Sequence, residues 1–246
     1  MKPELLSAFA RSLIVQASWN SDRMVGVGVA YVMEPLLRDL RGAEAGLRYR
    51  RALKRVASFF NAHPYLTGMA AGALARAEHD GLPEAQAERL KNALIGPLGS
   101  VGDQLVWAGW LPLSAAAGLI VAATVSVPAG VAAFLLWYNA VHLGLRAWGL
   151  AVGWRTGMGV ARALAGRMLQ LGVRFGALAA PFAIGVALPL VLARLAEGFQ
   201  ARERLAAAVV GGLGLVISRG LAPTVSGVKL GLLFVLSALV AGWIWR

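Results

Sequence analysis

The stretch "LLWYNAVHLGLRAWGLAVGW", residues 135–154, is typical of a membrane span that carries one polar stripe. It lies in an apolar run over 129–153, and a helix needs about 20 apolar residues to cross a bilayer. Asn139, His142 and Arg146 recur at spacings of three and four, which puts them on one helix face. Because polar side chains in a span face protein or water rather than lipid, the stripe favours a packed bundle or complex.

The rest of the chain also has the composition of a membrane protein. Its residues are 58% hydrophobic and 15% charged, with a mean hydropathy of +0.65, against about 45–50% and about 25% in soluble domains. The sequence predicts about five membrane segments, at 104–126, 129–153, 172–193, 205–218 and 229–245. The fourth run is short, so it is a re-entrant or broken helix, or a tilted span.

The charged residues separate the chain into two regions. Nine of the twelve acids precede residue 92, where apolar residues recur at helical spacing between polar ones. We therefore expect an all-α integral membrane helix bundle. Residues 1–91 form an interfacial region of amphipathic helices on the cytoplasmic side, with a re-entrant turn, and residues 92–246 form the transmembrane region.

The positive charges predict the orientation of this bundle. Arg155, Arg162, Arg167 and Arg174 lie between the second and third apolar runs, whereas the connection between the first two carries no charge. Since Lys and Arg gather in cytoplasmic loops, the N-terminus is expected in the cytoplasm. The formal net charge of +12 is explained in the same way, and the chain has no nucleic-acid recognition motif beside it.

Asn61 and His63 lie in "FFNAHPY", residues 59–65, just before Pro64 and between aromatic residues. One interpretation is a helix C-terminus followed by a polar turn. The other is a loop that enters the membrane zone, where Asn61 and His63 hydrogen-bond a sugar hydroxyl or the backbone of a partner.

Asp103 lies in "GPLGSVGDQLVW", residues 96–107, after Gly99 and Gly102. Glycine and proline permit tight backbone geometry, so the stretch predicts a loop, and Asp103 is expected to open the helix that follows. One interpretation is that Asp103 only caps that helix. The alternative is a polar pathway in which Asp103 accepts from a hydroxyl-rich substrate or pairs with an arginine, for which Arg146 is a candidate.

Sites for chemistry are not evident. The three histidines are not at metal-ligand spacing, and the glycine-rich stretch lacks the lysine of a phosphate-binding loop. The absence of cysteine excludes disulfides and thiolate ligands. We therefore expect no catalytic residue, cofactor or metal ion in this chain.

Four stretches together resemble a known family. These are "QASWNSDRM" (16–24), "RRALKRVASFFNAHPY" (50–65), "KNALIGPLGSVGD" (91–103) and the opening stretch, and they resemble the IID membrane subunit of the mannose/fructose/sorbose family of phosphotransferase systems. The chain departs from that pattern at Gln104, where the family usually has proline, and at His142, where an arginine is expected. Its later polar segment is also shorter.

The resemblance implies partners and a role. A IIC membrane subunit would complete the sugar channel for a mannose-type hexose. The two subunits would form heterodimers, which would assemble further into an oligomer in the lipid of a bacterial inner membrane. Cytoplasmic IIA and IIB domains would carry the phosphoryl group, and this chain would carry none. Asp103 with its glycines, and Asn61 with His63, would line the pathway or contact IIC. A non-transporting scaffold or regulatory subunit derived from the family is the alternative.

Overall fold

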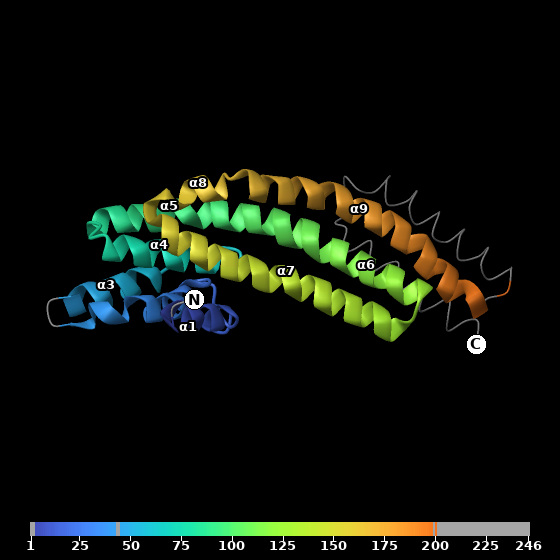
Figure 1. The fold of residues 1–246 in the computed structure, drawn as a ribbon, viewed down its shortest axis with the longest axis horizontal. Coiled ribbons are helices and arrows are strands. Elements are labelled where there is room, and N and C mark those ends of the chain that lie inside the picture. The colour runs from blue at the N-terminus through green and yellow to red at the C-terminus, as the bar shows by residue number, and fades with distance from the viewer. Residues whose placement is uncertain (1–2, 43–44, 199, 201–246) are drawn as a thin grey trace. The chain divides into compact units, whose positions relative to one another are not determined.

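The computed structural model describes residues 3–42, 45–198 and 200, which form helices, turns and two isolated β-bridges (Figure 1). The chain divides into two compact units, residues 1–191 and 192–246, and the first holds every site residue named above. The apolar runs predicted at 205–218 and 229–245 lie outside the described residues.

The described part begins with short helices and continues with long ones. In chain order the elements are α1 (Pro3–Ser12), α2 (Gly26–Met33), the 3-10 helix η1 (Glu34–Arg41), α3 (Ala45–Val56), α4 (Thr67–His79), α5 (Glu84–Gly102), the π-helix η2 (Asp103–Trp110), α6 (Leu111–Thr124), α7 (Val127–Thr156), the 3-10 helix η3 (Gly157–Gly159), α8 (Val160–Leu164), α9 (Arg167–Leu195) and the 3-10 helix η4 (Ala196–Gly198).

The prediction of a loop before Asp103 is wrong, because α5, η2 and α6 form one continuous helical segment. Pro97 lies inside α5, and the backbone N–H of Asp103 donates to the carbonyls of Gly99 and Ser100 instead of beginning a new helix. Leu94, Leu98 and Gly102 are buried on one face of α5 at a spacing of four residues, so the packing of this face favours a continuous helix. Asp103 is therefore not an N-cap residue.

Asp103 and Arg146 enclose a helical hairpin that carries no charge, since residues 104–145 contain no Asp, Glu, Lys or Arg. The hairpin turns between α6 and α7, where the side chain of Ser126 caps α7 by accepting from the backbone N–H of Ala129. At about 1.5 Å per residue, the helix from Val127 to Arg146 is about 29 Å long. This matches the hydrocarbon thickness of a bilayer, about 30 Å.

The burial of α7 changes at the same level. Most large apolar side chains from Val127 to Leu143 are exposed, as at Leu136, which is 74% exposed, while Leu145 and Leu150 are buried. The exposed set on α7 is Val127, Val131, Leu135, Leu136, Trp137, Val141 and Leu143. Residues 127–143 thus present an apolar surface of the kind that lipid or another membrane chain covers.

Three of the described helical segments are long and apolar enough to cross a membrane: Glu84–Thr124, Val127–Leu164 and Arg167–Gly198. They contain the apolar runs predicted at 129–153 and 172–193 and all but the last two residues of the run predicted at 104–126. No described helix before Glu84 meets the same criteria. The predicted all-α membrane helix bundle is confirmed.

Glycines let α4 and α7 pack closely. A Cβ added to Gly153 would lie 2.1 Å from the carbonyl oxygen of Met69, and one added to Gly72 would lie 2.6 Å from the backbone nitrogen of Trp154. Small residues are the usual means of close helix approach in membrane proteins. The part of α7 beyond Arg146 is in this way fixed to the N-terminal region.

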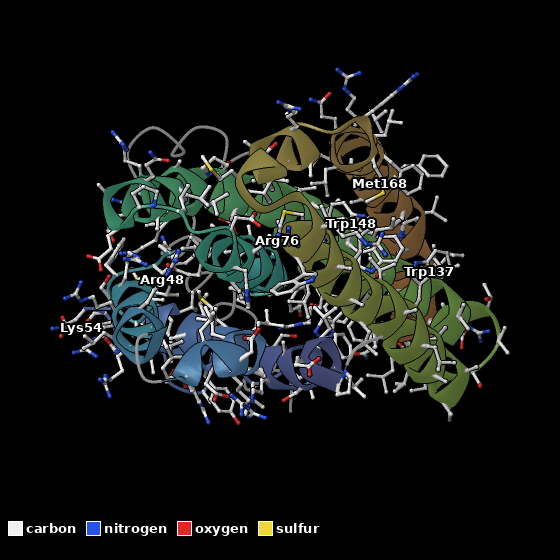
Figure 2. The ribbon with its side chains drawn as sticks, turned by 60° about the vertical axis from the view of Figure 1, so that its left-hand side comes forward. Arg48, Lys54, Arg76, Trp137, Trp148 and Met168 are labelled. Atoms are coloured by element: carbon white, nitrogen blue, oxygen red, sulfur yellow. The ribbon has the colours of Figure 1, made fainter. Side chains whose placement is uncertain are left out.

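Buried carboxylates hold the N-terminal helices together. Glu78 on α4 is 4% exposed and forms ion pairs with Arg48 and Arg55 of α3. Figure 2 shows Arg48 and Lys54 on α3, at the opposite side of the view from Trp137 in the uncharged hairpin. The basic side chains and the apolar hairpin therefore occupy different parts of this unit.

Glu34 joins α1 to η1. Its carboxylate forms ion pairs with Arg11, at 2.7 Å, and with Arg38, at 3.0 Å, and it also pairs with Arg41. Burial works against the ionised form, but the hydrogen bonds and charges of Arg38 and Arg11 outweigh it, so the pKa of Glu34 lies below its ordinary value.

The close packing of α4 and α7 predicts that Gly153→Ala destabilises the fold. Overpacking of this kind costs about 1–3 kcal/mol, because the methyl group would meet the Met69 carbonyl. Gly144→Ala on the same helix is the matched control, since a Cβ there meets nothing within 4 Å. Thermal unfolding in mild detergent measures the difference, and equal midpoints for the two variants would contradict the packing argument.

The Glu34 cluster predicts an acid-sensitive contribution to stability. A carboxyl with a lowered pKa in the folded state stabilises the fold fully above its unfolded pKa, about 4.5, and loses this contribution as the pH falls through the lower folded pKa. Glu34→Gln should lower the unfolding midpoint at pH 7 and reduce the loss of stability on acidification below about pH 4.5. Glu84→Gln, whose pair with Arg51 is exposed, should do neither in the same pH series.

Candidate functional site

Arg146 lies at the centre of the candidate site, buried at 3% exposure. Its Nη1 donates to the backbone carbonyl of Ser12 at the end of α1, and its Nε donates to Nε2 of His142 at 2.8 Å. Its guanidinium carbon lies 4.7 Å from the ring centroid of Tyr65. Among the described residues no carboxylate pairs with Arg146, so carbonyl, imidazole and aromatic groups solvate this cation.

The polar stripe of α7 is a chain of hydrogen bonds. Because Nε2 of His142 accepts from Arg146, the neutral ring carries its proton on Nδ1, which faces Oδ1 of Asn139 at 3.3 Å. Nδ2 of Asn139 donates to the carbonyl of Leu135 at 2.7 Å. The predicted common face of Asn139, His142 and Arg146 is therefore present, and the three side chains are linked.

The connection from α3 to α4 brings Tyr65 onto this stripe. The Tyr65 ring stacks on His142 with centroids 4.2 Å apart, and its hydroxyl lies 2.5 Å from that of Tyr138. The start of the connection is held by Phe60, which is fully buried and whose backbone N–H and carbonyl bond Arg23 and Val25. A buried loop needs such pairing for its backbone.

His63 presents a donor that finds no partner within residues 3–42, 45–198 and 200. Nδ1 accepts from the backbone N–H of Tyr65 at 3.2 Å, so the neutral ring carries its proton on Nε2. That atom is buried without a hydrogen bond. Burial, together with the charge of Arg146, lowers the pKa of His63 to about 4, which keeps the ring neutral. Trp107 lies beside it, with ring centroids 4.9 Å apart.

The two predicted glycines differ in what they do. A Cβ on Gly102 would lie 2.1 Å from Cβ of His63, so only glycine permits this approach of α5 to the loop. A Cβ on Gly99 would meet nothing within 4 Å. Gly102 therefore belongs to the site through His63, whereas the structure gives Gly99 no comparable contact.

Asn61 and Asp103 are exposed and stand apart from the buried cluster. Neither side chain makes a hydrogen bond or ion pair with the described residues, and Asp103 and Arg146 do not form the pair that the sequence suggested. The two residues flank the uncharged hairpin in the sequence, Asp103 before it and Arg146 after it. An exposed carboxylate accepts hydrogen bonds, and Trp107, which is 44% exposed, offers an aromatic face one turn beyond it.

The sequence interpretation missed Tyr65, Trp107, Tyr138 and the carbonyl of Ser12. Tyr138 could have been found, because it precedes His142 by four residues and extends the stripe by one turn. A backbone carbonyl more than 130 residues away from Arg146 leaves no signal in the side-chain pattern. Within the described part of the chain, the arrangement gathers hydrogen-bonding and aromatic side chains without pairing a nucleophile with a base.

Comparisons with known proteins agree with this fold. The family model described as the PTS system mannose/fructose/sorbose family IID component matches residues 1–189. The chain is 34% identical over 188 residues to the sorbose-specific EIID component of Klebsiella pneumoniae, covering 74% of this chain and 68% of the relative. It is 30% identical over 209 residues to the fructose permease IID component of Bacillus subtilis, covering 80% and 75%.

A solved structure points the same way. The cryo-electron-microscopy structure of the mannose transporter ManYZ in complex with microcin E492 is similar at a TM-score of 0.59 and 28% identity. The match covers 76% of this chain and 69% of that chain. The family model thus spans residues 1–189 of this chain, and two members share 30% or more of their aligned residues with it. The chain belongs to the IID components of the mannose/fructose/sorbose family of phosphotransferase systems.

Proposed function

We propose that this IID component forms a translocation unit with a IIC membrane subunit and takes part in the phosphorylation-coupled uptake of a mannose-type hexose. The observation that carries the proposal is the polar cluster at the end of the uncharged hairpin. There the ring of His63, whose Nε2–H has no partner among the described residues, lies beside Trp107. His63 also packs against Gly102, which directly precedes the exposed Asp103.

The chemistry of this cluster suits a hydroxyl-rich ligand. A sugar offers hydroxyl groups that both donate and accept, and the exposed carboxylate of Asp103 is an acceptor for them. The Nε2–H of His63 is buried, so it would donate to a sugar only in a state of the complex that opens a path to it. The exposed ring face of Trp107 suits the apolar face of a pyranose. The relatives named for sorbose and fructose, and the mannose transporter ManYZ, are all named for hexoses or their transport.

The exposed apolar surface of the hairpin supports a second membrane subunit. Trp137 is 51% exposed in the middle of the uncharged part of α7, and its ring packs on that of Trp110. A tryptophan is more typical of the membrane interface than of its centre. A IIC subunit that covers Trp137 would remove this exposure, and it would supply the other wall of the sugar pathway.

The histidines support phosphoryl transfer by other chains. His63 is buried, His142 is bonded to Arg146, and Nε2 of His79 lies 2.9 Å from the carbonyl of Leu36. A phosphoryl carrier needs an imidazole nitrogen that is accessible to its donor. IIA and IIB domains would therefore carry the phosphoryl group to the sugar.

Loop charges support a bacterial inner-membrane location with the N-terminus in the cytoplasm. The α6–α7 turn is uncharged, whereas Arg155 and Arg162 follow Arg146 on the opposite side of the hairpin. By the positive-inside rule that side is cytoplasmic. IIA and IIB would then approach the face that carries residues 1–91.

An uptake experiment distinguishes the proposed transport function from the scaffold alternative. We would express the chain with and without a IIC subunit of the same system in cells that lack their own mannose-type permease, and measure uptake of labelled mannose, fructose and sorbose. The proposal predicts uptake that requires IIC, this chain and phosphoenolpyruvate. Recovery of IIC by co-purification without uptake of any of the three sugars would support the scaffold.

Asp103→Asn should lower the rate of this uptake by about ten- to a hundredfold, the loss expected for about 1.4–3 kcal/mol of a charged hydrogen bond. Because Asp103 is exposed, the unfolding midpoint in detergent should not change. Glu84→Gln is the matched control, an exposed acid at the other end of the same continuous helix. Unchanged uptake by Asp103→Asn would remove this carboxylate from the pathway.

A further inference from the structure

Four large apolar side chains are exposed on the connections that surround the site, outside the spanning helices. Leu13, Ile14 and Trp19 follow α1 and are 46%, 57% and 58% exposed, and Phe59 in the α3–α4 connection is 46% exposed. The two connections are joined, since Met24 forms β-bridges with both Asn20 and Phe60. Such a gathering of exposed apolar side chains indicates a surface that something covers.

The position of this surface is fixed by Arg146. The carbonyl of Ser12, which is the residue directly before Leu13, accepts from Nη1 of Arg146. Arg146 in turn ends the uncharged part of α7, about 29 Å from Val127 and therefore about one hydrocarbon thickness from the far side of the bilayer. Leu13 thus follows a residue that lies at the membrane boundary.

Figure 1 agrees with this position. The turns after α1, in dark blue, lie at the end of the N-terminal helices that is nearer to the α6–α7 turn, while α3 lies toward the opposite end. The apolar connections therefore lie on the side of the N-terminal helices that faces the uncharged part of the hairpin, whereas the basic helix α3 lies on the other side.

The composition of the segment is that of a membrane interface. Residues 12–21 contain no charged side chain, with Arg11 before them and Asp22 and Arg23 after them. Tryptophan is enriched at the level of lipid headgroups, and aliphatic side chains beside it enter the acyl boundary. Val15 within the segment is fully buried, which ties the connection to the protein core.

We propose that residues 13–19, together with Phe59, form an interfacial anchor that inserts Leu13, Ile14 and Trp19 into the lipid at the cytoplasmic boundary of the membrane. The anchor holds the N-terminal helices against the bilayer. In doing so it fixes the depth of the connection that carries His63 and Tyr65. This proposal concerns lipid contact and does not depend on which sugar is transported, or on transport at all.

The absence of cysteine in the chain allows a direct test, because one introduced cysteine takes one spin label. Ile14→Cys would be labelled in the full chain, both alone and with IIC, in nanodiscs of phosphatidylethanolamine and phosphatidylglycerol. Oxygen gathers in lipid and a water-soluble nickel chelate stays outside, so their relative effects on the label give its depth. Leu178→Cys, 76% exposed on α9, is the lipid control, and Leu47→Cys, 56% exposed on α3, is the water control.

The anchor predicts that the label at residue 14 is relaxed by oxygen more than by nickel, at a depth of about 5–10 Å below the headgroups. A label at Trp19→Cys should give the same result, and it serves if the first variant is unstable. Relaxation by nickel equal to that at Leu47 would overturn the proposal. So would an immobilised label that neither reagent reaches, since that result means protein rather than lipid covers the segment.

Discussion

The burial of Arg146 is the constraint on which the arrangement of this unit depends. A guanidinium at 3% exposure needs partners for its N–H groups, and the described residues supply no carboxylate. Arg146 donates hydrogen bonds to the carbonyl of Ser12 at the end of α1 and to His142 on α7 itself. Its guanidinium also lies over the ring of Tyr65 in the α3–α4 connection. One side chain on α7 therefore ties two connections of the N-terminal region to the end of the uncharged hairpin.

This constraint explains why polar and apolar features meet at one level. After Arg146 in the sequence, α7 packs on α4 through glycines and is part of the N-terminal core. Before Arg146, the hairpin has no charge and exposes large apolar side chains. The proposed sugar pathway and the proposed lipid anchor both lie at the transition. We infer that the N-terminal helices act as a support that holds His63 and its neighbours at the depth of the pathway.

Much of the fold could be predicted from particular residues. The apolar runs before and after Ser126 predicted two of the spans, and the spacing of Asn139, His142 and Arg146 predicted a common face. Asp103 was misjudged because Gly96, Pro97 and Gly99 favour loops, whereas the buried face of Leu94, Leu98 and Gly102 keeps α5 helical. Local propensity does not include this tertiary packing.

The candidate site was predictable only in part, for a related reason. His63, Gly102 and the α7 stripe were found because each stands out in an apolar or aromatic context. The sequence did not indicate that Tyr65 would join His63 to His142, because that contact depends on the path of the α3–α4 connection. Nor could it indicate the Ser12 carbonyl, since every residue has one. Contacts through the backbone become visible only once the fold is known.

Hydrogen exchange of Arg146→Met in lipid nanodiscs tests the central role of this side chain most directly. Methionine retains the apolar stem but leaves the Ser12 carbonyl and His142 without their donor. Amides of residues 13–25 and 60–66 should exchange about tenfold faster or more, which corresponds to a loss of about 1.4 kcal/mol, while those of residues 131–141 remain protected. Arg155→Met, an exposed arginine at the end of the same helix, should change neither set. Unchanged exchange of residues 13–25 and 60–66 in Arg146→Met would contradict the account.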